Sequence, residues 1–145
     1  ADQLGLIAMR MDGDYFYFQF DPIGSVVMIL SSSEDLNSYQ YDTFGLITKS
    51  IESINNSFKF VGQWGVMQIP EIAELYFMRT RFYDAEIGRF LSVDPLGIEG
   101  MSKNFYVYAY NNPVHLRDPS GKIIWQLFRD GVWSVGKYVL KGNDV

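Results

Sequence analysis

The sequence predicts an all-β domain of antiparallel hairpins that ends in a C-terminal amphipathic helix. Three observations favour this fold: a high aromatic content, a hairpin-like unit that recurs at a regular spacing, and helical periodicity near the C-terminus. Aromatic residues make up 17% of the 145 residues, and β-sheets accommodate them well. A hydrophobic content of 48% against 20% charged residues excludes a disordered chain.

The recurring unit has the pattern aromatic-x-aromatic-Asp-x-x-Gly. It spans residues 18–24 and 39–45, so that Asp21 and Asp42 lie 21 residues apart, and a related unit at 82–88 follows another 42 residues on. Alternating aromatics predict a strand, the aspartate begins a turn by accepting backbone hydrogen bonds, and the glycine gives the freedom to leave it. Each unit is therefore predicted to be a β-hairpin of about 20 residues, as in stacked repeats.

Further strands are predicted along the rest of the chain, separated by a polar loop at residues 50–57. They comprise residues 25–30, 46–49, a strand pair at 58–67 with glycine bends, 75–82, 89–93 and 104–110. The last of these alternates clearly, with Tyr106, Tyr108 and Tyr110 on one face, and the Asn-Asn-Pro that follows predicts a turn.

The segment after Gly121 differs in its periodicity. Between residues 123 and 140 the apolar positions recur at helical spacing, which predicts a short amphipathic helix. The change in composition between Gly121 and Lys122 marks the internal boundary that the sequence supports. A lipid-facing role for this helix, through Trp125 and Trp133, is an alternative, but the net negative charge of the chain argues against a membrane partner.

Composition excludes several kinds of site and partner. The chain has no cysteine, which excludes disulfides, cysteine-zinc sites and thiol nucleophiles, and its one histidine, His115, excludes a multi-histidine metal site. A net charge of −5 argues against nucleic acid, whose phosphates need a basic surface. We therefore expect no cofactor, no metal and no nucleic-acid partner. Neither a signal peptide nor a transmembrane segment is predicted.

Two Asp-Pro-x-Gly units provide the candidate chemistry. Asp94 and Asp118 begin them, with the predicted strand 104–110 between. One interpretation is that both are ordinary β-turns, with proline at the second position and glycine at the fourth. The other is that a hairpin-like return brings both carboxylates together, where such a pair can act as general acid and base on a peptide bond. The spacing alone leaves both interpretations open.

Four arginines are candidates to pair with these aspartates, because arginine suits a partly buried carboxylate. They are Arg79, Arg81, Arg89 and Arg117. A nucleophilic triad of His115, a nearby serine and Asp118 is a weaker alternative, because no glycine-flanked nucleophile elbow is present.

Several of these stretches together resemble the RHS repeat-associated core domain. They are LYFMRTRFYD at 75–84, GRFLSVDPLG at 88–97, NFYVYAYNNP at 104–113 and DPSG at 118–121. The upstream units resemble YD repeats, and FVGQWG at 60–65 is similar to the strand that precedes the core. The resemblance covers residues 5–121. It implies YD-type hairpin repeats at 1–57, the RHS-associated core at 58–121 and a variable, helical tail at 122–145.

In this family, YD repeats spiral into a hollow β-shell that encloses a toxin, and the core closes one end. In many members the core cuts the chain just after the last Asp-Pro-x-Gly unit. Carried over by motif, the catalytic residues would be Asp94 and Asp118 with Arg89 in support, and the scissile bond would be Lys122–Ile123. Lys122 is a departure, since the family usually has leucine there.

The resemblance thus implies the C-terminal core of an RHS/YD-repeat polymorphic toxin, a secreted effector of bacterial competition. It would cap a β-shell and cut its own chain once by aspartate-dependent autoproteolysis, without multiple turnover. The alternative is a non-catalytic assembly module whose exposed sheet edges pair with a partner chain. Expected partners are the remaining shell or another chain, and an immunity protein for the tail.

The chain holds too few repeats to close a shell. We expect an end fragment of a larger protein, a truncated remnant or a piece that joins a partner shell. The resemblance further implies synthesis in the cytoplasm and export by a dedicated bacterial secretion system.

Overall fold

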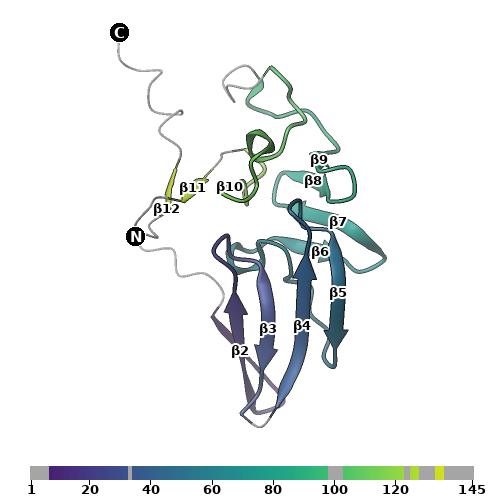
Figure 1. The fold of residues 1–145 in the computed structure, drawn as a ribbon, viewed down its shortest axis with the longest axis vertical. Coiled ribbons are helices and arrows are strands. Elements are labelled where there is room, and N and C mark those ends of the chain that lie inside the picture. The colour runs from purple at the N-terminus through teal and green to yellow at the C-terminus, as the bar shows by residue number, and fades with distance from the viewer. Residues whose placement is uncertain (1–6, 33, 98–102, 123–124, 128–132, 136–145) are drawn as a thin grey trace.

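The computed structural model describes residues 7–32, 34–97, 103–122, 125–127 and 133–135, and their regular structure is almost entirely β-strand (Figure 1). The strands form three antiparallel sheets, ordered β1-β2-β3-β4-β5, β6-β7-β8-β9 and β10-β11-β12, which we call sheets A, B and C. The prediction of an all-β fold built from antiparallel hairpins is therefore confirmed. Among the described residues, no helix has the length and hydropathy needed to cross a bilayer.

Sheet A contains the two hairpin repeats of the sequence. Its strands are β1 (Ala8–Met11), β2 (Asp14–Phe20), β3 (Val26–Leu30), β4 (Asp35–Tyr41) and β5 (Ile47–Glu52). The alternation in β2 decides its orientation, because Phe16 and Phe18 are buried while Tyr15 and Tyr17 are exposed. The buried face packs in one apolar cluster with Ile29 of β3 and other side chains of the sheet.

Sheet B forms the second half of the domain. It contains β6 (Met67–Ile69), β7 (Ile72–Met78), β8 (Arg81–Asp84) and β9 (Arg89–Phe90), and the short 3₁₀ helix η1 (Gly62–Trp64) precedes it. In Figure 1 these strands lie across the end of sheet A at which β4 leads into β5. Two hydrogen bonds join the sheets there: Tyr76 donates to the carbonyl of Gly45 (3.1 Å) and Tyr83 to that of Phe44 (2.6 Å).

The ring of Phe60 is the centre of the core between the sheets. Its centroid lies 6.2 Å from that of Tyr41, 5.7 Å from Tyr76, 6.0 Å from Tyr83 and 6.1 Å from Tyr108. Offset and tilted ring pairs at such distances are favourable beyond the apolar area that they bury. One aromatic cluster therefore joins the second repeat, sheet B and the segment after it.

The predicted strand at residues 104–110 is wrong. The segment makes one isolated bridge, between Val107 and Arg89, and then enters the 3₁₀ helix η3 (Ala109–Asn111). All three residues of η3 have positive φ angles, between 46° and 57°, which a strand cannot contain. The alternating aromatics have another cause, because Tyr108 is buried against Tyr83, with ring centroids 4.4 Å apart.

Three further predictions need correction. The strand pair predicted at residues 58–67 is instead the 3₁₀ helix η1 with turn and irregular structure on either side, and only Met67 of this segment lies in a strand, β6. The single strand predicted at 75–82 is a hairpin of β7 and β8 with a tight turn at Arg79, whose φ is +58°. The described parts of the predicted C-terminal helix are strands, β11 (Trp125–Leu127) and β12 (Trp133–Val135), and the rest of that helix lies outside the described residues. Pairing of β11 with β10 (Leu116–Arg117) provides backbone hydrogen bonds that override the helical periodicity.

Candidate functional site

The aspartates of the hairpin repeats hold their turns through one carboxylate oxygen. In the second repeat, Asp42 Oδ1 accepts hydrogen bonds from the backbone N–H groups of Phe44 and Leu46, both at 2.9 Å. Gly45 follows with a φ of +93°, which requires glycine. The Asp21 turn makes the equivalent pair of contacts at 3.1 and 2.7 Å. The repeated motif is therefore a repeated turn structure, as the sequence predicts.

The two later Asp-Pro-x-Gly units use the same turn chemistry. Asp94 Oδ1 accepts from the N–H of Leu96 at 2.8 Å, and Asp118 Oδ1 accepts from the N–H of Lys122 at 3.1 Å. In each unit the glycine N–H also donates to the aspartate carbonyl, at 2.9 and 3.2 Å respectively. One carboxylate oxygen, Oδ2, is left over from the turn in each unit.

Both Oδ2 atoms meet the same guanidinium nitrogen. Arg81 Nη2 lies 3.1 Å from Asp94 Oδ2 and 3.3 Å from Asp118 Oδ2. The side chains are 2%, 14% and 2% exposed for Arg81, Asp94 and Asp118, so the cluster is largely removed from solvent. The structure thus brings the two sequence-predicted aspartates together, and it selects Arg81 from the four candidate arginines as their partner.

The rest of the Arg81 guanidinium is fixed by the surrounding backbone. Its Nε donates to the carbonyl of Gly121, its Nη1 donates to the carbonyl of Phe105 at 3.1 Å, and its Cζ lies 3.5 Å from the ring centroid of Phe90. Burial lowers the pKa of Arg81, and the charges of Asp94 and Asp118 act against this shift. One cation therefore joins two turns, the segment between them and β9.

The last turn is also docked on the hairpin turn between β7 and β8. Thr80 Oγ1 donates to the carbonyl of Ser120 at 2.8 Å. A Cβ atom at Gly121 would lie 2.7 Å from the carbonyl oxygen of Met78, and the φ of Gly121 is +68°. Only glycine fits this position, because any side chain would collide with backbone atoms.

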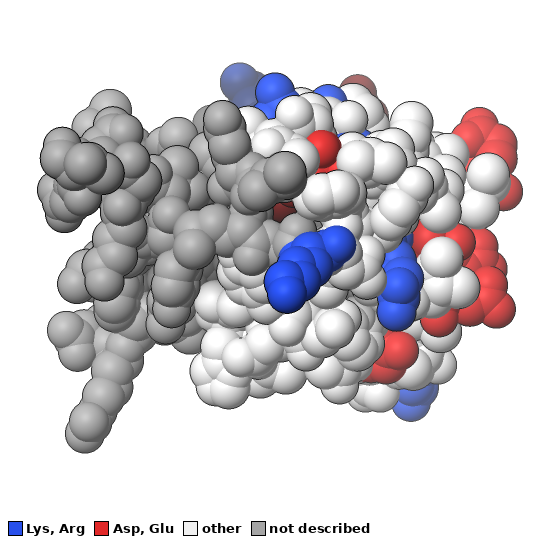
Figure 2. Space-filling view, turned by 90° about the horizontal axis from the view of Figure 1, so that it is seen from above, with Lys and Arg blue, Asp and Glu red and all other residues white. Residues whose placement is uncertain are grey.

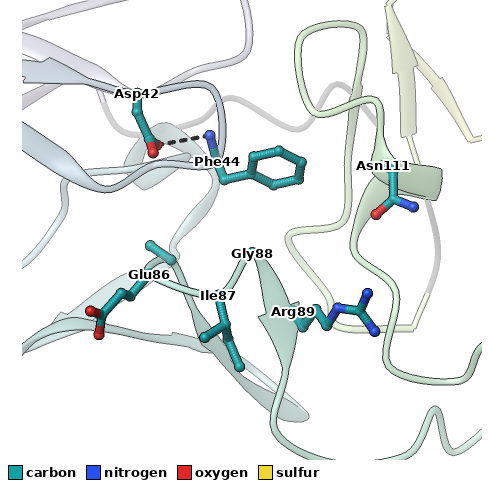
Figure 3. A pocket seen from close by; sticks show the side chains of 8 residues that line it. Asp42, Phe44, Glu86, Ile87, Gly88, Arg89 and Asn111 are labelled. Carbon is teal, nitrogen blue, oxygen red and sulfur yellow. Dashed lines mark hydrogen bonds between the residues drawn. The ribbon is translucent and has the colours of Figure 1, made fainter.

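Arg89, the predicted supporting residue, lies at a different place. Its exposed side chain faces an open hollow of about 270 Å³, opposite Asn111 (Figure 3). The hollow is lined by Asp42, Phe44, Ala85, Glu86, Ile87, Gly88, Arg89 and Asn111. Two acidic side chains and Arg89 stand on different sides of it, so the hollow carries charges of both signs. A role for Arg89 at the aspartate pair stays a prediction.

Arg117 is buried and crosses the core to the first repeat. Its Nη1 donates to the carbonyl of Ile23 at 2.9 Å, and its Cζ lies 3.7 Å from the ring centroid of Trp64. Burial lowers the pKa of Arg117 to about 9. This side chain therefore fixes β10, near the end of the core, to the turn that begins with Asp21.

The other candidate residues have separate contacts. Arg79 donates to the carbonyl of Trp64 at 3.1 Å, and the His115 Nδ1 atom lies 3.1 Å from Asn112 Oδ1. Lys122 is exposed, and Ile123, on the other side of the predicted scissile bond, lies outside the described residues. In the part of the chain that the structure describes, no group of three or more acidic or histidine side chains could hold a metal ion.

Charged side chains on the face drawn in Figure 2 are dispersed. The basic side chains of the described residues do not form one patch there, and some of them lie beside the acidic side chains that gather at one side. A phosphate backbone is bound by clustered lysine and arginine side chains. This face therefore presents separate charges and a mainly uncharged surface.

Sequence reasoning did not single out Arg81. The signal available was a charged side chain inside an aromatic strand, on the same face as buried Tyr83 and therefore at an inward position of β8. A buried arginine requires an acidic or carbonyl partner, so the inward position itself predicts a polar contact. Which aspartates provide it depends on packing between distant segments.

Comparison with known proteins gives consistent results. Residues 2–114 match the family model described as teneurin YD-shell. The tRNA3(Ser)-specific nuclease WapA of Bacillus spizizenii is 34% identical over 138 residues, covering 90% of this chain and 6% of WapA. Toxin protein Tse5 of Pseudomonas aeruginosa is 44% identical over 66 residues, covering 46% of this chain and 5% of Tse5.

A solved structure contains a region of similar fold. One chain in the crystal structure of TcdB2-TccC3-Cdc42 matches with a TM-score of 0.65 and 25% identity, over 78% of this chain and 5% of that chain. The chain thus spans a small fraction of each relative, 6% at most of those named here. Because the family model covers most of its length, the chain belongs to the teneurin YD-shell family, as a domain related to the RHS/YD-shell toxins.

Proposed function

We propose that this chain forms the closing end of a YD shell and fixes the point at which the C-terminal segment leaves the shell wall. Sheet A would continue the wall, and residues 58–121 would close it. The relatives support this proposal, because each contains the matched region as a small part of a much longer chain.

Long-range contacts support the closing role. The bond from Arg117 to Ile23 joins residues 94 positions apart, and the bonds from Tyr76 and Tyr83 to the Asp42 turn join sheet B to sheet A. These contacts fix the end of the core against both repeats. Residues 58–121 are therefore suited to block a shell, because their contacts with the repeats hold them in position in addition to the pairing of their own short strands.

The observation that carries the proposal is the open edge at β5. Among the described residues, β5 pairs only with β4, and all its side chains after Ile47 are exposed. An unpaired edge invites pairing with another strand. We propose that a further repeat of the shell, or a partner chain, adds to sheet A at this edge, while Arg81 and Arg117 hold the closing segment, residues 58–121, in place.

A pair of isoleucine substitutions tests the open edge. Ile51 in β5 is 61% exposed and Ile72 in the interior strand β7 is 50% exposed, so lysine at either position leaves the core unchanged. We expect the wild-type chain to self-associate in sedimentation velocity, Ile51→Lys to be monomeric, and Ile72→Lys to behave as the wild type. A wild-type chain that is monomeric at all concentrations would remove the support for strand addition.

Self-cleavage is a second candidate function, and the meeting of Asp94 and Asp118 favours it. In this proposal Asp118 acts as acid or base with Asp94 as its partner, and Arg89 supports them. The carboxylate that acts as base takes a proton from a water molecule that attacks the Lys122 carbonyl carbon, and the one that acts as acid gives a proton to the Ile123 nitrogen as the Lys122–Ile123 bond breaks. The C-terminal segment would then be released from the closed end. A non-catalytic assembly module is the alternative, in which both aspartates serve only their turns and Arg81.

The side chain at position 122 offers a direct test of this candidate. The lysine is exposed, and the family usually has an apolar leucine at this position, so Lys122→Leu restores the usual residue without disturbing the core. We expect the intact mass of the denatured Lys122→Leu chain to show more loss after residue 122 than the wild type does. Uncut chains for both proteins would leave the closing role without cleavage.

The toxin relatives suggest a function for the longer protein to which this chain would belong. Because they include a tRNA nuclease and a toxin protein, we propose that the longer protein is a secreted effector of bacterial competition. An immunity protein would then bind the segment after Lys122. Co-purification of a neighbouring gene product with the full chain, but not with a chain ending at residue 122, would test this partner.

A further inference from the structure

We infer that a second copy of this chain pairs with the open edge of sheet A, so that two β5 strands lie antiparallel about a two-fold axis at Ile51. The inference rests on the proposed open edge of β5 and names the partner that the edge fits. In Figure 1, β5 lies at one margin of sheet A, beyond β4. The surface consists of the edge backbone groups of Ser50 and Glu52 and of the Ile51 side chain.

The register of β5 on β4 decides which of its backbone groups lie at the edge. The N–H of Ser53 donates to the carbonyl of Leu36 at 3.0 Å, so these two residues form a hydrogen-bonded pair of the ladder. Antiparallel partners alternate between hydrogen-bonded and non-hydrogen-bonded pairs, which directs the groups of Ile51 toward β4. The N–H and C=O groups of Ser50 and Glu52 therefore point to the open edge.

The side chains of β5 do little to protect this edge against pairing. Edge strands commonly avoid association through charges, prolines or bulges. Glu52 is bound within its own chain, because Lys59 Nζ lies 2.6 Å from Glu52 Oε1. The strand contains no proline, and its register shift lies at the start of β5, beside Gln40 and Tyr41. The side chain of Ile51, which is 61% exposed, is then the main apolar group at the edge.

The strand directions favour a two-fold arrangement. All pairs in sheet A are antiparallel, so β1 and β5, at its two margins, run in the same direction. A second copy added through β1, with its apolar face on the same side, would be parallel to β5 and would leave a new open edge. A second copy added through its own β5 is antiparallel, and the assembly is complete with two chains.

The residue types of β5 select one register for this pair. With Ile51 on the axis, the edge groups of Ser50 bond to those of Glu52 in the second copy, and two isoleucine side chains meet in a favourable cross-strand pair. A register with Lys49 or Glu52 on the axis would set like charges opposite each other. A register with Ser50 on the axis would pair Glu52 with Thr48, where the bulge interrupts the strand.

The first test places charges at position 51. Because Ile51 is exposed, neither lysine nor glutamate there disturbs the core. We expect sedimentation velocity to give twice the chain mass of 16.7 kDa for the wild type, and association weakened about tenfold or more in both Ile51→Lys and Ile51→Glu, since like charges then meet on the axis. An equimolar mixture of these two variants should associate, because lysine then faces glutamate.

The matched controls are Ile72→Lys and Ile72→Glu, at a position in the interior strand β7 that is 50% exposed. Each control should associate by itself as the wild type does. Mixing the two controls should change nothing.

The second test measures one distance across the axis. The chain has no cysteine, so a single introduced cysteine can form a disulfide only with the second copy. Opposite residues of a non-hydrogen-bonded pair have Cα atoms about 4.5 Å apart, which a disulfide spans. We expect mild oxidation to link Ile51→Cys chains in pairs. The two cysteines of Ser50→Cys would be diagonal neighbours about 7–8 Å apart, too far to be linked.

A mixture of Ile51→Lys and Ile51→Glu that stays monomeric would overturn the inference, and so would linkage through Ser50→Cys instead of Ile51→Cys. If the wild type associates and Ile51→Glu alone is as strongly associated, the two-fold at Ile51 is wrong although the open edge is in use. Growth beyond two chains would likewise contradict the two-fold alone. A wild-type chain that is monomeric would overturn the inference and remove the support for the open edge as well.

Discussion

The repeat turns at Asp21 and Asp42 and the later turns at Asp94 and Asp118 have the same local structure in different surroundings. All four begin with an aspartate whose Oδ1 binds the turn, and all four contain a glycine with positive φ. The later pair is bound in addition by Arg81 of β8.

This difference shows that the motif determines the conformation of the turn. A side chain from a distant part of the sequence determines whether the turn belongs to a buried charged cluster. In the repeats, the turns connect strands of sheet A. The Asp42 turn also accepts hydrogen bonds from Tyr76 and Tyr83 of sheet B, and the Asp21 turn accepts one from Arg117. In the later turns, the second carboxylate oxygen, Oδ2, contacts Arg81 and is part of a buried charged cluster. The same four-residue unit therefore provides a scaffold in one region and a candidate site in the other.

Removal of Arg81 should separate the two regions most strongly. We expect Arg81→Gln to lower the free energy of unfolding by about 3–5 kcal/mol, because it leaves a buried carboxylate pair without its cation. Arg10→Gln should change it little. Urea denaturation of both variants measures these changes. Similar losses in the free energy of unfolding would show that Arg81 contributes no more to stability than an exposed arginine does.

Glycine substitutions test how tightly each turn is packed. Gly45 of the Asp42 turn has a φ of +93°, and an added Cβ would lie 2.4 Å from Cγ of Phe60. Gly97 of the Asp94 turn has a φ of +53° and nothing within 4 Å. We expect Gly45→Ala to cost about 2–4 kcal/mol, from strain and overpacking, and Gly97→Ala about 1–2 kcal/mol, from strain alone. Thermal unfolding measures the stability of the two variants. A larger loss for Gly97→Ala than for Gly45→Ala would contradict the tighter packing around Gly45.

Isosteric changes of the aspartates isolate the charge. Asparagine keeps an Oδ1 acceptor for the turn, so Asp42→Asn should alter stability by less than about 0.5 kcal/mol. Asp118→Asn keeps the turn but loses its charge against Arg81, and should cost about 1.5–3 kcal/mol. Denaturant midpoints measure both changes. Equal costs would mean that the ion pair adds nothing to the turn.

A pH titration probes the interior of sheet A, where Tyr39 is a buried titratable group. Burial raises the pKa of Tyr39 to about 12, and its hydroxyl accepts a bond from Asn37 Nδ2 at 2.8 Å. Between about pH 10 and 12 the unfolded chain loses this proton first, so stability falls as the pH rises through that range.

The variant Tyr39→Phe should remove this one contribution. Its stability should fall less steeply than that of the wild type between pH 10 and 12, by up to about 1.4 kcal/mol per pH unit, while the other tyrosines affect both proteins alike. Unfolding curves at pH 9 to 12 compare the slopes, and identical slopes would exclude Tyr39 as the cause.

The parts of the fold that depend on local chemistry follow from the sequence. The aspartate and glycine of each repeat act within a few residues, and the turns at Asp21 and Asp42 are where the pattern predicts them. The alternation at 104–110 predicts a strand wrongly, because positive φ angles at Ala109 and Tyr110 end the extended conformation. The residue types at these positions do not indicate positive φ angles. The pairing of β11 with β10 is equally non-local.

The candidate site can be predicted from the sequence only in part, because it too depends on contacts between distant segments. The sequence raises the convergence of Asp94 and Asp118 as one of two interpretations, because each motif is visible by itself. The identity of the arginine between them is set by the register of β8 against the last turn, which brings Arg81 within reach of Gly121, 40 residues away. Such a register is decided by the packing of Phe60 and its neighbours, and no local pattern encodes it.

The measurement that tests the functional difference between the two kinds of turn most directly is the intact mass of the denatured chain, compared among the wild type, Asp42→Asn, Asp94→Asn and Asp118→Asn. The self-cleavage proposal predicts that the wild type and Asp42→Asn lose the segment after Lys122, whereas Asp94→Asn and Asp118→Asn stay whole. Loss of the segment from all four proteins, or from none, would contradict it, because the later turns would then differ from the repeat turns in structure only.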